Sequence, residues 1–216
     1  MHYRDSLAEL IGTFTLVFIG AGAGALAASN GGGIVAVALA HGVALMVIVY
    51  AWGAISGAHV NPAVTFGLAV TGRISWFKAA QYWIGQLVGA ALAGFLLRFL
   101  LGTTGNLGMT LPSSSVSPLQ AVVIEAVLTF FLVTAVYGSA VAGRNGNAGG
   151  LAIGLVLTMD ILMGGSLTGA SMNPARSFGP ALALTSFDGF WIYLLGPLAG
   201  GATAAFLYER VFMKSS

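Results

Sequence analysis

Cysteine is absent from the 216 residues, and charged residues are scarce, at 6% of the chain. The absence of cysteine excludes disulfides, thiolate metal sites and thiol nucleophiles. With 57% hydrophobic residues and a mean hydropathy of +0.93, a water-soluble domain would have almost no polar surface to present to solvent. The composition therefore indicates a protein whose solvent is lipid.

The chain contains long stretches without charge. None of the 63 residues between Glu9 and Arg73 is Asp, Glu, Lys or Arg, whereas a membrane-spanning helix needs only about 20 apolar residues. The first apolar segment includes Glu9 and extends well past the hydrophobic region of a signal peptide, so we interpret it as a span. The eight basic residues are dispersed, which argues against a nucleic-acid surface.

Apolar runs separated by Gly, Ser and Pro predict an all-α membrane protein with six spanning helices and two half-length helices. The spans are expected at about 7–28, 34–54, 77–101, 119–140, 148–166 and 189–211, and the half-helices at about 62–71 and 174–184. We expect one transmembrane domain over residues 1–216.

The tripeptide Asn-Pro-Ala occurs twice, as Asn61-Pro62-Ala63 and, 112 residues later, as Asn173-Pro174-Ala175. Asn is a strong helix N-cap and Pro is favoured at the first helical position, so each copy predicts a helix start. Both starts lie outside the long spans and therefore in re-entrant loops, which bilayers tolerate only where the backbone is packed in protein or lines a cavity. The duplicated motif points to a membrane pore.

Three spans and a half-helix in each half predict inverted repeats, at about 1–110 and 111–216. Glu9 and Glu125 support this duplication, because each lies early in the first helix of its half. Carboxylates within spans are expensive and face the protein interior. They could relay protons or accept hydrogen bonds from backbone N–H groups of the re-entrant loops, and we favour the second role.

The basic residues also predict an orientation. The predicted outer loops around 28–33 and 102–117 contain no Lys or Arg, so the positive-inside rule places both termini in the cytoplasm. The basic residues expected on the inner side are Arg4, Arg73, Lys78, Arg144, Arg210 and Lys214.

The segments 39–67 and 160–180, which contain the two Asn-Pro-Ala motifs and the sequence Arg176-Ser177-Phe178-Gly179, resemble the aquaporin (major intrinsic protein) family. The resemblance extends over essentially the whole chain and is strongest to tonoplast intrinsic proteins and related ammonia-permeable water channels. It implies a homotetramer without cofactor or metal. It also implies a selectivity filter on the outer side, formed by His41, Ile161, Ala170 and Arg176.

A mechanism follows from these residues. Asn61 and Asn173 would meet near the midplane with their amide N–H groups free to face the pore, while the positive ends of the half-helices exclude cations and hydronium. Carbonyls in the loops before the half-helices would accept hydrogen bonds from passing water. These carbonyls belong to Gly57, Ala58, His59, Gly169, Ala170 and Ser171.

The slender Ile161 and Ala170, together with a histidine donor, predict a filter that passes ammonia as well as water, and we extend this expectation to urea or hydrogen peroxide. Glycerol is less favoured, because Ser177 and Ala181 stand where glycerol facilitators of the family have Asp and a basic residue. Leu194 stands where water-selective members have Trp, so strict water selectivity is not implied. A broader facilitator that includes glycerol remains the alternative.

Several single residues allow two interpretations. His41 could instead be a buried histidine bonded to a carbonyl, or could make the pore sensitive to pH. His59 fits a pore-lining and a structural role equally well. Asp160 would either bond a neighbouring loop, which we favour, or polarise the outer vestibule.

Other functional classes fit less well. Three His, two span-buried Glu and scattered Ser show no nucleophile–base or metal-ligand spacing, so we expect no enzyme. An ion-coupled secondary transporter is the strongest rival class, because broken helices also bind substrates at the midplane. A junction protein is a third alternative. We expect the plasma or inner cell membrane as the location, with the vacuolar membrane as the alternative.

Overall fold

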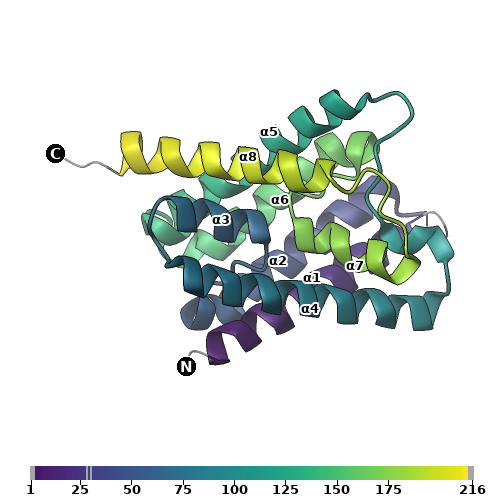
Figure 1. Cartoon of the computed structure of the whole chain (residues 1–216), viewed down its shortest axis with the longest axis horizontal. Helices are drawn as coiled ribbons and strands as arrows, with labels where there is room; N and C mark the ends of the chain where they lie inside the picture. Colours follow the sequence, from purple (N-terminus) through teal and green to yellow (C-terminus); the bar gives the residue numbers. More distant parts are fainter. Residues whose placement is uncertain (1–2, 28, 30, 214–216) are drawn as a thin grey trace.

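The computed structural model describes residues 3–27, 29 and 31–213, and within these ranges all regular structure is helical. Long helices lie side by side, with two short helices packed among them (Figure 1). The α-helices are α1 (Tyr3–Leu26), α2 (Gly33–Ser56), α3 (Pro62–Val70), α4 (Trp76–Leu101), α5 (Pro118–Val136), α6 (Gly149–Thr168), α7 (Pro174–Leu184) and α8 (Ile192–Leu207). Shorter helical turns are η1 (Thr104–Gly108), η2 (Tyr137–Val141), η3 (Gly146–Ala148) and η4 (Tyr208–Phe212).

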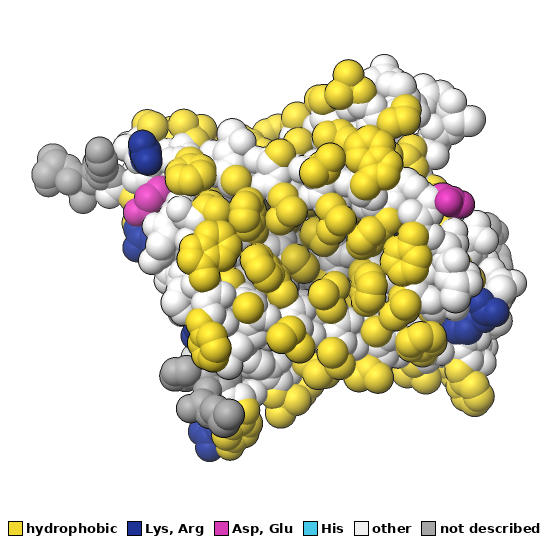
Figure 2. All heavy atoms as spheres, viewed as in Figure 1, with side chains coloured by type: hydrophobic (Ala, Val, Ile, Leu, Met, Phe, Trp, Pro, Cys, Tyr) yellow, Lys and Arg dark blue, Asp and Glu magenta, His cyan; other side chains and the backbone are white. Residues whose placement is uncertain are grey.

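Five helical segments of the described chain are long and apolar enough to cross a membrane. They are α1, α2, α4, α5 continued by η2, and η3 continued by α6. The 16-residue α8 continues into η4 and packs along α5, which makes it the sixth long helix. Figure 2 shows hydrophobic side chains across the middle of one face and charged side chains near its two ends, a pattern typical of a membrane-spanning bundle.

The predicted six long and two half-length helices are confirmed, with small differences in their bounds. The last helix begins at Ile192 rather than at 189, because Gly189 has a left-handed φ of 68° and belongs to a turn. Lys214 and residues 28 and 30 of a predicted outer loop lie outside the described residues.

The two half-helices begin as their motifs dictate. The Asn61 side chain accepts a hydrogen bond from the Ala63 N–H at 2.8 Å, and Pro62 occupies the first turn of α3. At α7, Asn173 caps two N–H groups, those of Ala175 at 3.0 Å and Arg176 at 3.2 Å. Each cap satisfies amide groups that would otherwise be unpaired at a helix start in a dry interior.

The packing follows the same pattern in both halves. Helix α1 packs against α4, and α5 packs against α8. Each half-helix then packs against a long helix of the other half, α3 against α8 and α7 against α4. Helices α2 and α6, the equivalent helices of the two halves, pack against each other. This interlocking holds the two half-helices between the long helices.

Glycine allows the close approach of these helices. A Cβ atom at Gly200 of α8 would lie 1.9 Å from the Ala126 carbonyl oxygen of α5. A Cβ at Gly89 of α4 would lie 2.2 Å from the Leu10 carbonyl oxygen of α1. Both distances are far inside van der Waals contact, so these backbones touch as in other membrane helix pairs built on small residues.

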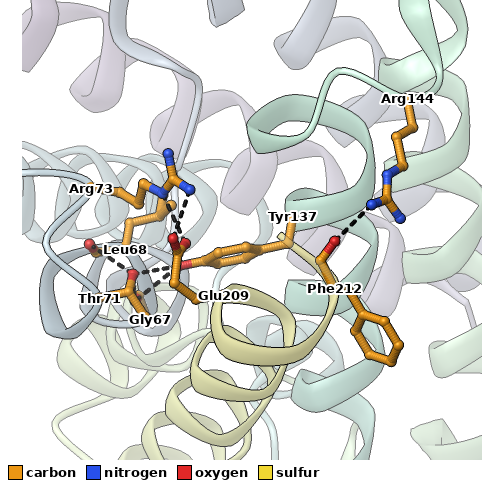
Figure 3. A network of polar contacts seen from close by, with 8 residues as sticks. All are labelled: Gly67, Leu68, Thr71, Arg73, Tyr137, Arg144, Glu209 and Phe212. Carbon is orange, nitrogen blue, oxygen red and sulfur yellow. Dashed lines mark hydrogen bonds and ion pairs between the residues drawn. The ribbon is translucent and has the colours of Figure 1, made fainter. Parts of the chain in front are cut away.

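Polar contacts join segments at the end of the bundle where α1 begins (Figure 3). Arg73, after α3, forms a bidentate pair with Glu209 of η4 at 2.8 and 2.7 Å. The Tyr137 hydroxyl of η2 contacts the Thr71 hydroxyl, and Arg144 donates to the Phe212 carbonyl at 2.8 Å. These contacts fasten the end of the last helix to both halves of the chain.

We expect Gly200→Ala to destabilise the protein by about 1–3 kcal/mol, because the added methyl group forces α8 away from α5. Gly53→Ala is the matched control, since a Cβ there would meet only Val49 Cγ1 at 3.8 Å. Thermal unfolding of both variants in detergent measures the difference. Equal midpoints for the two variants would contradict the close helix contact.

Candidate functional site

The loops that precede the half-helices have an unusual backbone. Ala58 and Val60 in the first loop have φ of 48° and 42°, and Ala170 and Met172 in the second have φ of 43° and 53°. Non-glycine residues rarely adopt this left-handed region, and such strain clusters at functional sites. Left-handed residues alternating along a chain turn successive N–H groups toward one concave side, which suits an anion.

The Glu9 carboxylate occupies that position behind the first loop. It accepts hydrogen bonds from the N–H groups of His59 at 2.9 Å and Val60 at 2.6 Å. The Ser56 hydroxyl donates to it at 2.7 Å and the Gln86 side chain at 2.8 Å. Glu9 is fully buried, so these donors replace the water that a carboxylate would otherwise require.

Glu125 makes the equivalent contacts behind the second loop. It accepts hydrogen bonds from the N–H groups of Ser171 at 2.9 Å and Met172 at 2.7 Å, and from the Thr168 hydroxyl at 2.7 Å. This carboxylate is also fully buried. The two halves therefore hold their loops by the same interaction.

Six carbonyls of the two loops have no hydrogen-bond donor in the described part of the chain. They belong to Gly57, Ala58, His59, Gly169, Ala170 and Ser171. Residues 57–59 and Ser171 line a central cavity, whereas Gly169 and Ala170 do not. The acceptors in contact with the cavity thus come mainly from the first loop.

Asn61 and Asn173 join the two loops to each other. The Asn61 side-chain amide donates to the Met172 carbonyl at 2.8 Å, and that of Asn173 donates to the Val60 carbonyl at 2.8 Å. An amide nitrogen has two N–H groups, so each asparagine uses one to bind the opposite loop. The expectation that the amide N–H groups of Asn61 and Asn173 are all free is therefore wrong. One N–H group of each side chain is still available to face the cavity.

The central cavity extends along the bundle from His41 and Arg176 to Ala140 and Ile153, and Asn61 and Asn173 line it between them. Most of the remaining lining is apolar. It includes Leu16, Leu45, Val49, Val64, Leu132 and Leu157. Such a lining gives small polar molecules hydrogen-bonding partners from few directions, which favours passage over tight binding.

At one end of the cavity, the buried Arg176 guanidinium contacts His41. Arg176 Nε donates to His41 Nε2 at 3.3 Å, while His41 Nδ1 lies 2.9 Å from the Val37 carbonyl oxygen. A carbonyl only accepts and a guanidinium only donates, so His41 is the Nδ1–H tautomer. Both ring nitrogens are thus occupied, and the expectation that His41 offers a donor to the pore is wrong.

Close packing fixes the His41 ring as well. A Cβ at Gly20 of α1 would lie 2.3 Å from His41 Cδ2. The absence of a side chain at Gly20 therefore provides the space in which the ring lies against α1.

The second partner of Arg176 comes from the loop after α4. Arg176 Nη1 donates to the Gly108 carbonyl at 2.7 Å. Residues Gly105, Asn106 and Leu107 in η1 have φ of 53°, 48° and 52°, a left-handed turn that costs about 1–2 kcal/mol for a residue such as Leu107. The sequence prediction missed Gly108, although the Gly-Asn-Leu-Gly segment is suited to a left-handed turn.

Hydroxyl groups support the second loop beside Arg176. The Ser177 hydroxyl lies 2.6 Å from that of Ser171 and 2.7 Å from that of Thr110. In the first half, His59 Nδ1 lies 3.1 Å from the Thr65 hydroxyl, at positions 112 residues earlier in the chain. His59 therefore combines both roles that the sequence left open, since it lines the cavity and bonds within its loop.

The other two expected filter residues lie beside the cavity. Ile161 and Ala170 are buried in the apolar cluster that also contains the cavity-lining Leu16, Leu45 and Leu157, although they are not themselves part of the lining. Asp160 is 1% exposed, and within the described chain its carboxyl oxygens have no hydrogen-bond partner. The expected bond from Asp160 to a neighbouring loop is therefore not present among these residues.

We expect Glu125→Gln to destabilise the protein by about 1–3 kcal/mol, because the new amide group places an N–H donor against a backbone N–H donor. The control is Glu209→Gln, which alters a partly exposed pair with Arg73 and should cost less than about 1 kcal/mol. Thermal unfolding in detergent compares the two. A larger loss at Glu209 would contradict the role of the buried carboxylate.

Comparison with known proteins agrees with this geometry. The family model described as Major intrinsic protein matches residues 1–208. The chain is 45% identical to Aquaporin TIP2-1 of Arabidopsis thaliana, over 99% of this chain and 89% of that protein. It is 47% identical to Probable aquaporin TIP1-1 of Oryza sativa subsp. japonica, over 97% of this chain and 87% of that protein.

A solved structure is similar over almost the whole chain. The X-ray structure of the aquaglyceroporin from Plasmodium falciparum has a TM-score of 0.89 and 27% sequence identity, and covers 98% of this chain and 97% of that one. Together with the family match over residues 1–208, these similarities identify the chain as a multi-pass integral membrane protein of the major intrinsic protein (aquaporin) family.

Proposed function

We propose that this protein is a passive water channel that also passes small neutral molecules and excludes protons and ions. The observation that carries the proposal is the cavity between the two re-entrant loops, with both asparagines in its lining and a buried arginine at one end. The curated relatives named aquaporins support the same function.

Exclusion of cations follows from the charges around this cavity. Helices α3 and α7 begin beside it, and each helix N-terminus is equivalent to about half a positive charge. Arg176 adds a full positive charge, whereas Glu9 and Glu125 do not line the cavity. A cation in the cavity therefore meets positive potential without a nearby exposed carboxylate.

We propose a filter formed by His41, Ile161, Ala170 and Arg176, with ammonia as the first additional solute and urea or hydrogen peroxide as further ones. The contact between His41 and Arg176 supports two of its members. Glycerol transport is a second candidate, which the similarity to an aquaglyceroporin favours. Glycerol transport is less favoured, because the Ser177 hydroxyl is buried and already hydrogen-bonded to the hydroxyls of Ser171 and Thr110.

The arrangement in the membrane is part of the proposal. We infer inverted repeats at about 1–110 and 111–216, supported by the equivalent contacts of Glu9 and Glu125. We propose cytoplasmic termini, a homotetramer, and a location in the plasma or inner cell membrane, with the vacuolar membrane as the alternative. The first turn of α1 and the last turns of the chain lie at the same end of the bundle (Figure 1), as this orientation requires.

We expect purified protein in liposomes to give fast water flux with a low activation energy in stopped-flow light scattering. Arg176→Ala should increase urea and glycerol permeability, because it removes the buried cation and its contact with His41. Arg98→Ala is the control, since Arg98 is exposed and bonds the Ala183 carbonyl.

Saturable uptake coupled to an ion gradient would overturn this function in favour of a secondary transporter. Folded protein without flux above that of empty liposomes would overturn the open pore and favour a junction role.

We expect water permeability to be constant between about pH 5 and 7, the range in which a histidine usually becomes protonated. Protonation of His41 would require a proton on Nε2, which already accepts a hydrogen bond from Arg176. Stopped-flow measurements across this range test the expectation. A fall on acidification that His41→Asn abolishes would contradict it.

A further inference from the structure

Asp160 differs from the other buried carboxyl groups of the chain. It lies in the middle of α6 and is 1% exposed, yet neither of its carboxyl oxygens has a hydrogen-bond partner in the described chain. Glu9 and Glu125, which are equally buried, accept hydrogen bonds from four and three donors. Asp160 therefore does not hold a re-entrant loop through hydrogen bonds, as Glu9 and Glu125 do.

The fold does not require a carboxyl group at this position. From α2 and α6 through the half-helices, residues 112 apart correspond, as do the left-handed Gly57 and Gly169 that end α2 and α6, and the capping Asn61 and Asn173. By this correspondence the counterpart of Asp160 is Ile48, which is 1% exposed in an apolar cluster. One half thus fills the position with an aliphatic side chain and the other with an acid.

The described elements that pack against the helix of Asp160 carry no Lys or Arg. Helix α6 packs against α2, α5, η2 and η3, and the sequence places no Lys or Arg on any of these elements. Their other titratable groups are His41 and Tyr50 on α2, Glu125 on α5 and Tyr137 on η2. Of these, Glu125 is the other buried carboxyl group, on a helix that packs directly against α6.

The charged form of Asp160 is therefore unfavourable on two grounds. An ionised carboxylate in a dry interior needs paired charge or hydrogen-bond donors, and Asp160 has neither among the described groups. Two neighbouring carboxylates also do not both ionise readily. Glu125 has three donors and is the better acceptor of negative charge.

We propose that Asp160 is a buried proton-binding site, neutral at neutral pH, and that its deprotonation lowers the permeability of the pore. Loss of the proton would place a second negative charge near Glu125, whose carboxylate binds the N–H groups of Ser171 and Met172. These residues immediately precede Asn173. Disturbance at Glu125 would consequently reach the loop that orients Asn173 and Arg176.

Infrared spectroscopy of the reconstituted protein tests the proton directly. We expect the wild type at neutral pH to show a carbonyl stretching band of a protonated carboxyl group that Asp160→Asn lacks. Asp188→Asn, at an exposed aspartate, should retain the band. Identical bands in wild type and Asp160→Asn would overturn the proposal. This measurement does not depend on an open pore, so its result is separate from the proposed function.

Water flux tests the consequence, and this second arm rests on the proposed channel function. Wild type and Asp188→Asn should lose water permeability as the pH is raised into the alkaline range, whereas Asp160→Asn should keep it. Asp160→Ile, which copies the other half, should behave like Asp160→Asn. Equal alkaline profiles for all four proteins, or failure of both neutral variants to fold, would overturn the proposal.

Discussion

The structure depends on the hydrogen bonds between two buried carboxylates and the backbone of two loops. Chain that is neither helix nor closed sheet has no water to bind within a bilayer, and each unsatisfied amide costs several kcal/mol. Glu9 and Glu125 satisfy the N–H groups at His59, Val60, Ser171 and Met172 from behind the loops. Without these acceptors, four N–H groups of the irregular backbone would be buried without a hydrogen-bond partner.

The same interaction leaves the loops with free carbonyls. Because the N–H groups turn toward the carboxylates, several carbonyls of residues 57–59 and 169–171 have no donor among the described groups. The side-chain amides of Asn61 and Asn173 then bind the opposite loop through the Met172 and Val60 carbonyls. A requirement of stability thus also supplies the acceptors that line part of the cavity.

The sequence predicted the helices and the two helix starts well, because apolar length, Asn caps and Pro at the first turn act locally. Contacts made across the bundle were harder to predict. The tautomer of His41 depends on Val37 and Arg176 together, and the Gly108 carbonyl reaches Arg176 only through a strained left-handed turn. The isolation of Asp160 depends on every neighbouring helix, which composition and spacing do not describe.

The difference between the halves explains why one end of the cavity bears a charge. The counterpart of Arg176 in the first half is Val64, 112 residues earlier, and both line the cavity. Arg176 can be buried because His41 and the Gly108 carbonyl accept its hydrogen bonds. A second buried guanidinium at position 64 without such acceptors would cost several kcal/mol. The duplicated scaffold therefore supplies a symmetric centre, while contacts from α2 and η1 that the first half lacks permit a single charged end of the cavity.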